Sequence, residues 1–142
     1  MRKSFIALCA TVALAGAAQS ASAQDYKVIV NSGVAVSDLS ADQAAKIFLK
    51  QTDKFASGTA AVPVYQVKAS AIRSAFDKAV LGKTVAAVET FWQQQIFSGK
   101  EVPPPTKATD DEVVSFVKAT PGGIGYVSAA AAVAGVKVVA IK

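Results

Sequence analysis

The sequence predicts an α/β protein with a mainly parallel sheet of about four strands flanked by helices. Two observations support this fold class. Short apolar segments rich in β-branched residues alternate with amphipathic helical segments, in the order β-α-β-α-α-α-β-α-β. The expected strands are apolar throughout instead of alternating with polar residues, which is typical of parallel strands that helices cover on both faces.

Four segments have the composition of buried strands. Each is rich in β-branched or aromatic residues and is bounded by Gly, Pro or polar residues. These segments are residues 26–31, 61–67, 124–127 and 136–141. Pro63 lacks the N–H that a sheet ladder needs, which indicates a strand start or a sheet edge. The three consecutive prolines within residues 101–105 predict a stiff connector near the polyproline II conformation.

Helix-start signals introduce the helical segments. Ser40 with Gln43, and Thr109 with Glu112, match the capping box, in which each side chain bonds the backbone N–H of the other residue. Ser70 is the expected N-cap of a helix whose apolar residues form one stripe. The expected helices cover residues 41–49, 71–81, 85–96, 110–120 and 128–135.

The N-terminus has the pattern of a secretory signal peptide. Arg2 and Lys3 precede an apolar run over residues 5–18, and a small-x-small motif ends at Ala23. The run is shorter than the roughly 20 apolar residues of a membrane span. We therefore expect cleavage after Ala23, a single domain over residues 24–142, a periplasmic location and no membrane insertion after cleavage.

The composition after cleavage excludes several classes of function. Loss of Arg2 and Lys3 reduces the 15 basic residues to 13, against 10 acidic ones, and no Cys or His remains once Cys9 is removed. Disulfides, thiolate or imidazole catalysis and the usual zinc sites are thereby excluded. The lysines are scattered, so we expect no nucleic-acid partner. The acidic cluster at 110–112 is explained by a helix start, and we expect no enzyme activity, metal or cofactor.

A candidate anion site lies where the second expected strand leads into the helix capped by Ser70. A helix N-terminus offers unpaired backbone N–H groups, here those of Ala71 and Ile72, and the positive end of the helix dipole. Lys68 and Arg73 add cationic side chains. Each of the three polar side chains also has an ordinary interpretation: Ser70 as a plain N-cap, Lys68 as a solvated lysine, and Arg73 in a salt bridge with Asp77 at the i,i+4 spacing.

Tyr126 is a further candidate for this site. It lies near the end of an expected strand, and open parallel sheets bind ligands beyond the carboxyl ends of their strands. The alternative for Tyr126 is packing in the core, with its hydroxyl at the surface.

Several segments resemble the second half of phosphate-type substrate-binding proteins of ABC transporters. The most specific is Pro-Gly-Gly-Ile-Gly-Tyr at 121–126. Arg73, Phe91-Trp92 and Phe97-Ser98-Gly99 are similar to a short, single-lobe class within this family. The other matching segments are residues 28–31, 39–40, 47–49, 58, 62–64, 70 and 76. The resemblance implies one lobe of a type II periplasmic binding protein.

The resemblance also implies a function. It indicates an exported solute-binding-like protein that binds phosphate or a similar small oxyanion for ABC-type uptake or sensing, with an ABC permease as partner. Full-length members carry Arg-Ser-Asp-Gly-Ser-Gly-Thr where this chain has residues 66–72, and only Ser70 is retained. The alternative is therefore a non-transport periplasmic interaction module that has lost anion binding and docks a protein partner or a second copy of itself as a homodimer.

Overall fold

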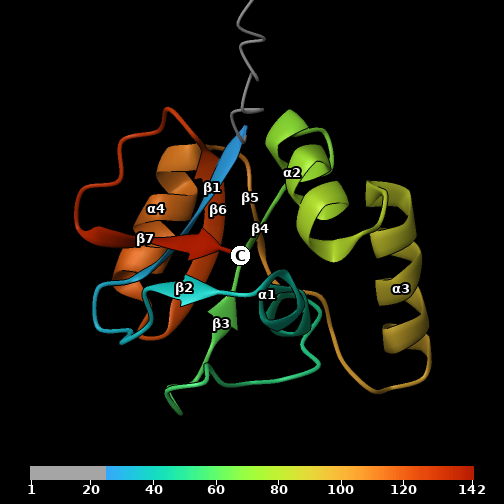
Figure 1. The fold of residues 1–142 in the computed structure, drawn as a ribbon. Coiled ribbons are helices and arrows are strands. Elements are labelled where there is room, and N and C mark those ends of the chain that lie inside the picture. Colours follow the sequence, from blue (N-terminus) through green and yellow to red (C-terminus); the bar gives the residue numbers. More distant parts are fainter. Residues whose placement is uncertain (1–24) are drawn as a thin grey trace, which may run out of the picture.

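The centre of the molecule is a five-stranded mixed sheet, seen in a computed structural model that describes residues 25–142 (Figure 1). The strand order is β2-β7-β1-β6-β3, and a separate parallel pair joins β4 to β5. The strands are β1 (Tyr26–Asn31), β2 (Asp38–Leu39), β3 (Val62–Pro63), β4 (Tyr65–Gln66), β5 (Thr106–Lys107), β6 (Gly123–Ser128) and β7 (Val136–Ile141). The expected signal peptide and its cleavage after Ala23 lie outside the described residues.

The expectation of an α/β fold is confirmed, but the expectation of a mainly parallel sheet of about four strands is wrong. The central strand β1 runs antiparallel to both of its neighbours, β6 and β7. Parallel pairing occurs where β2 joins β7 and where β3 joins β6. The apolar strand pattern reports that both faces of a sheet are covered, and it does not report the direction of the strands.

Coverage of both faces is visible within β1. Val28 and Val30 point into the larger core cluster, whereas Ile29 points into a second cluster. The second cluster is completed from α4 (Asp110–Ala119) by Val113 and Val117. Successive side chains of a strand point to opposite faces, so a strand buried on both sides must be apolar at every position.

The other helices are α1 (Ala41–Phe48), α2 (Ala71–Phe76), η1 (Asp77–Leu81) and α3 (Val85–Phe97). Both predicted capping boxes are present, at Ser40 with Gln43 and at Thr109 with Glu112. The helix expected over residues 71–81 is present but changes at Asp77 from α-helix to the wider π-helix η1. Among residues 25–142, no helix combines the length and the apolar character that a membrane span requires.

Two elements of the structure differ from those that the sequence predicts. The segment 61–67 is divided into β3, which pairs with β6, and β4, which pairs with β5. Residues 129–135 form turns and a bend instead of a helix. A segment this short has little helical stability of its own, and Lys27 donates a hydrogen bond to the carbonyl of Ala131 at 2.7 Å, which fixes a non-helical path.

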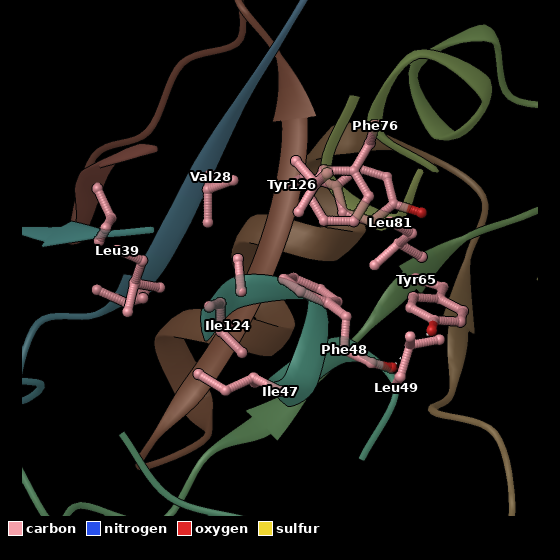
Figure 2. Close-up of a cluster of buried hydrophobic side chains, with 14 of the residues drawn as sticks. Val28, Leu39, Ile47, Phe48, Leu49, Tyr65, Phe76, Leu81, Ile124 and Tyr126 are labelled. Atoms are coloured by element: carbon pink, nitrogen blue, oxygen red, sulfur yellow. Dashed lines mark hydrogen bonds between the residues drawn. The ribbon is translucent and has the colours of Figure 1, made fainter. Parts of the chain in front are cut away.

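Aromatic packing fixes α2 against the sheet. The rings of Phe76 and Tyr126 stack with centroids 4.0 Å apart, and Phe48 of α1 meets Phe76 edge-on at 4.7 Å (Figure 2). On the opposite face, Gly125 leaves room for α4, because a Cβ atom there would lie 2.8 Å from a methyl group of Val113. The C-terminal end of α2 is therefore held against the core by Phe76.

Candidate functional site

Ser70 is the N-cap of α2, as the sequence predicts. Its hydroxyl oxygen accepts a hydrogen bond from the backbone N–H of Arg73 at 3.2 Å. The same hydroxyl donates to Oε1 of Gln66 at 2.5 Å. The hydroxyl hydrogen of Ser70 is thus committed to a buried side chain within the protein.

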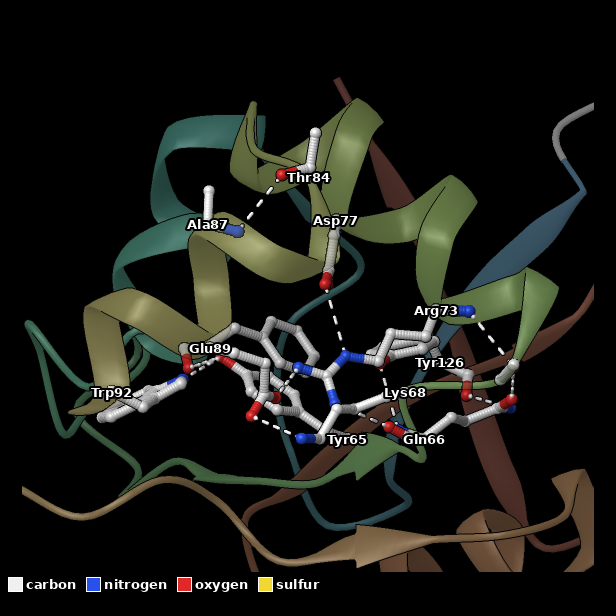
Figure 3. Close-up of polar contacts among 12 residues, drawn as sticks. Tyr65, Gln66, Lys68, Arg73, Asp77, Thr84, Ala87, Glu89, Trp92 and Tyr126 are labelled. Atoms are coloured by element: carbon white, nitrogen blue, oxygen red, sulfur yellow. Dashed lines mark hydrogen bonds and ion pairs between the residues drawn. The ribbon is translucent and has the colours of Figure 1, made fainter.

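Arg73 is almost completely buried, with 1% of its surface exposed. Its Nε lies 3.3 Å from Oδ2 of Asp77, which is the i,i+4 salt bridge expected as the ordinary interpretation. Its Nη1 donates to the carbonyl of Gln66 at 3.2 Å, and its Nη2 lies 2.8 Å from Oε1 of Glu89 (Figure 3). The guanidinium also lies 4.9 Å from the ring centroid of Tyr65. Arg73 is therefore fixed on several sides.

Asp77 is fully buried beside this arginine, at the start of η1. Burial raises the pKa of the Asp77 carboxyl from 3.8 to about 6, although the charge of Arg73 opposes this shift. The second carboxylate oxygen, Oδ1, has no hydrogen-bond partner among residues 25–142. Arg73 is thus the principal compensation for a buried carboxylate.

Lys68 and Arg73 line the same cavity, which has a volume of about 550 Å³. Glu89, from α3, lies between them, with Oε2 at 3.4 Å from Nζ of Lys68 and Oε1 on Arg73. The remaining walls come from Tyr65, Val67, Ala69, Thr106 and the three prolines at 103–105. The cavity therefore contains two cations, one carboxylate and a rigid apolar wall.

Tyr126 belongs to a different environment from Lys68. Its side chain is completely buried, as the core interpretation expects, but its hydroxyl is buried too and accepts a hydrogen bond from the backbone N–H of Gln66 at 3.0 Å. Burial raises the pKa of Tyr126, so the hydroxyl stays protonated. Tyr126 thus positions Gln66 and does not line the cavity around Arg73.

Gln66 connects the two environments. Its side-chain amide donates to Oδ1 of Asp110 at 2.7 Å and to the carbonyl of Tyr126 at 3.2 Å. Its Oε1 accepts from Ser70, and its backbone carbonyl accepts from Arg73. Because every polar group of Gln66 is engaged, the turn between β4 and α2 has one well-defined geometry.

Asp110 closes the network from the start of α4. Its two carboxylate oxygens accept hydrogen bonds from the backbone N–H and the hydroxyl of Ser128. Burial alone would raise the pKa of Asp110, but the hydrogen bonds from Ser128 and Gln66 outweigh burial and lower it. The carboxylate therefore remains ionised and satisfies donors near the N-terminus of α2.

The six predicted site residues do not form one cluster. Lys68 and Arg73 meet at the cavity, whereas Ser70 and Tyr126 are joined through Gln66. Ala71 is exposed and Ile72 packs against the core, so these two contribute backbone N–H groups of the first turn of α2. Among residues 25–142, no group of three or more Asp, Glu, His or Cys side chains is arranged to hold a metal ion.

Sequence reasoning missed Glu89 and Gln66 as parts of the site. Glu89 lies 16 residues from Arg73, on another helix, and no helical or strand spacing relates the two positions. The helix-start interpretation of Asp110 explains its place on α4 but not its bonds to Ser128. The available signal was weak: Glu89 is the only acidic residue on α3, in a segment otherwise made of apolar residues, threonine and glutamines.

Comparison of the sequence with protein-family profiles and with curated proteins finds no match. Comparison with solved structures does find similar folds. One match is a protein from Clostridium perfringens, described as a phosphate ABC transporter substrate-binding protein and solved with bound phosphate. The match has a TM-score of 0.65 and 20% identity, and it covers 82% of this chain and 44% of that chain.

Two further structures agree with this match. An ABC-type phosphate transport receptor from Vibrio cholerae matches with a TM-score of 0.62 and 16% identity, over 82% of this chain and 46% of that chain. PstS from Borrelia burgdorferi matches with a TM-score of 0.65 and 16% identity, over 83% of this chain and 47% of that chain. The chain therefore has the fold of phosphate-type substrate-binding proteins and spans about half the length of the solved structures it matches.

Proposed function

We propose that this chain is an exported solute-binding protein that takes up a small oxyanion, phosphate or one of similar shape, in the cavity between Lys68 and Arg73. The observation that carries the proposal is that the only arginine of residues 24–142 and a neighbouring lysine line one cavity of about 550 Å³. A guanidinium presents a planar set of donors that suits carboxylate and phosphate oxygens. The fold shared with phosphate-binding proteins supports the same ligand class.

The residues have distinct roles in this proposal. Lys68 contacts the anion from the exposed side, and Arg73 contacts it from the buried side. Ser70 caps α2 and orients its first turn, where the N–H groups of Ala71 and Ile72 add positive potential. Tyr126 acts at a distance, because it holds Gln66, whose carbonyl fixes Arg73. The role is binding, with no chemical step on the ligand, and delivery to an ABC permease or a sensor is its proposed purpose.

Charge distinguishes this cavity from a larger hollow of about 700 Å³ beside α4. The larger hollow is lined by Asp111 and Glu112 as well as Lys107. Its two carboxylates oppose the binding of an anion, whereas the walls of the Arg73 cavity carry two cations and one carboxylate, with the buried Asp77 paired to Arg73 behind the wall. The smaller cavity is therefore the better candidate for an oxyanion.

Isothermal titration calorimetry with inorganic phosphate and with sulfate, at low ionic strength, tests this function. We expect saturable binding that weakens as salt is added, because the site is open to solvent and its charges are screened. Lys68→Gln is expected to weaken binding, while Lys83→Gln, which removes the same charge from an exposed position elsewhere, is expected to leave it unchanged.

Two results would contradict the proposal. The first is the absence of both heat and thermal stabilisation at millimolar phosphate and sulfate. The second is an equal loss of binding in the two lysine variants, which would indicate a diffuse charge effect. With no anion binding, a module that docks a protein partner becomes the better account of the fold.

A further inference from the structure

Glu89 occupies the place between the two cations of the cavity. One of its carboxylate oxygens lies 2.8 Å from Nη2 of Arg73, and the other lies 3.4 Å from Nζ of Lys68 (Figure 3). An external carboxylate or phosphate would make the same two contacts, one oxygen to each cation. The side chain of Glu89 therefore has the position and the chemistry of a ligand.

Arg73 has three partners besides Glu89. Asp77 pairs with Nε, the carbonyl of Gln66 accepts from Nη1, and the ring of Tyr65 lies against the guanidinium. Departure of Glu89 would leave Arg73 in the same place and still compensated by the charge of Asp77. One donor edge of the guanidinium would then face the cavity.

Glu89 is partly exposed to solvent, unlike Arg73. Its side chain is 30% exposed, and its partner Lys68 is 70% exposed. The ion pair between Glu89 and Lys68 therefore has small net stability, since water competes for both partners. The adjoining cavity of about 550 Å³ gives the carboxylate room to rotate, and the opposite wall is stiffened by the prolines at 103–105.

We propose that Glu89 is a built-in competitor for the oxyanion: its carboxylate occupies the site when the site is empty and is displaced when an external oxyanion binds to Arg73 and Lys68. The proposal rests on the function proposed above and specifies how that site is regulated. The competing carboxylate keeps affinity low, because each bound anion must first separate Glu89 from two cations and then remain near its negative charge.

Titration of phosphate into the wild type and the Glu89→Gln variant tests the proposal. Glutamine keeps the shape of glutamate but removes its charge. We therefore expect Glu89→Gln to bind phosphate at least about tenfold more tightly than the wild type. The repulsion between an anion and a unit charge a few ångströms away, at a partly exposed site, is larger than the free energy that a tenfold change in affinity represents. Adding Lys68→Gln to Glu89→Gln should remove most of the gain. Acetate, a single-charged planar probe, should show the same order of affinities.

The chain offers a matched control in Glu101. This glutamate also pairs with a lysine at 3.4 Å, Lys50, but outside the cavity. Glu101→Gln changes the net charge by the same amount and should leave phosphate binding unchanged. Glu89→Asp supplies a second test: its shorter side chain keeps the charge but cannot span both cations, so its affinity should lie between those of the wild type and Glu89→Gln. Far-ultraviolet circular dichroism confirms that each variant is folded.

The outcomes separate the two proposals. If the wild type binds phosphate and Glu89→Gln binds no better, the competitor role is overturned and the proposed function stands. If Glu101→Gln gains as much as Glu89→Gln, a general charge effect overturns the competitor role. If neither the wild type nor Glu89→Gln binds phosphate or acetate, both proposals are overturned.

Discussion

Replacing Arg73 with methionine should destabilise the protein strongly at neutral pH. Arg73 is the cation that compensates the fully buried carboxylate of Asp77, and methionine keeps an unbranched apolar stem without the charged guanidinium. The loss of one partner leaves a buried charge with no counter-charge beside it. Such losses typically cost about 3–5 kcal/mol of unfolding free energy.

The structure supports a value within that range. Asp77 already has one carboxylate oxygen with no hydrogen-bond partner among residues 25–142, so it has little other compensation. The variant also frees the carbonyl of Gln66 and the carboxylate of Glu89 from their donor. Glu89 is partly exposed and can turn to water, so most of the loss comes from Asp77. For a domain with about 5–15 kcal/mol of total stability, this is a large fraction.

Urea unfolding followed by the fluorescence of Trp92, the single tryptophan, measures the effect. At pH 7.5 we expect Arg73→Met to lose about 3–5 kcal/mol. At pH 5, below the raised pKa of about 6, Asp77 is mostly protonated in the native state and needs no cation, so the loss should shrink to less than about 2 kcal/mol. Lys83→Met, which removes an exposed positive charge, should change stability by less than about 0.5 kcal/mol at either pH.

Two results would refute this reasoning. One is a loss below about 1 kcal/mol at pH 7.5, which would mean that the buried carboxylate is compensated by something other than Arg73. The other is an equal loss at both pH values, which would mean that packing and not charge accounts for the effect.

Three further predictions concern pH, packing and capping. The pKa of Asp77 is raised from 3.8 to about 6, so between these pH values the native state holds a proton that the unfolded state releases. The free energy of unfolding should therefore fall as pH rises through that window. Urea titrations at several pH values should show this slope in the wild type and no such slope in Asp77→Asn. Gly125→Ala should lower the free energy of unfolding by about 1–3 kcal/mol through overpacking. The added Cβ would lie 2.7 Å from a methyl carbon of Val64 and 2.8 Å from one of Val113. A calorimetric melting temperature equal to that of the wild type would contradict this packing. Thr109→Ala removes the N-cap of α4 and should cost about 1 kcal/mol in urea unfolding, whereas an unchanged midpoint would show that the cap is dispensable.

Much of the fold follows from local signals in the sequence. The capping boxes of α1 and α4 and the cap at Ser70 depend on residues three positions apart, which the sequence displays directly. Strand direction depends instead on how distant segments pair. β1 is antiparallel to both β6 and β7, and no local pattern distinguishes this arrangement from a parallel one, because helices cover both faces in either case.

The candidate site was predictable only in part. Lys68, Ser70 and Arg73 were recognisable because they surround one helix start, and the Arg73–Asp77 pair follows from i,i+4 spacing. Two of the partners of these residues come from other helices. Glu89 of α3 contacts Arg73, and Asp110 of α4 accepts a hydrogen bond from Gln66. Such contacts depend on the tertiary fold, so they carry no signature in a single sequence.

The most direct test of the proposed site is an NMR titration of the purified protein with inorganic phosphate, observing the Nε–Hε group of Arg73. Arg73 is the only arginine among residues 25–142, so its side-chain signal can be assigned without ambiguity. We predict a saturable shift of this signal and of the backbone signals of Lys68 and Glu89, with no comparable shift at the Lys50–Glu101 pair. The account would be contradicted if the Arg73 signal stayed unmoved at millimolar phosphate and low salt, or if shifts were spread evenly over all lysines.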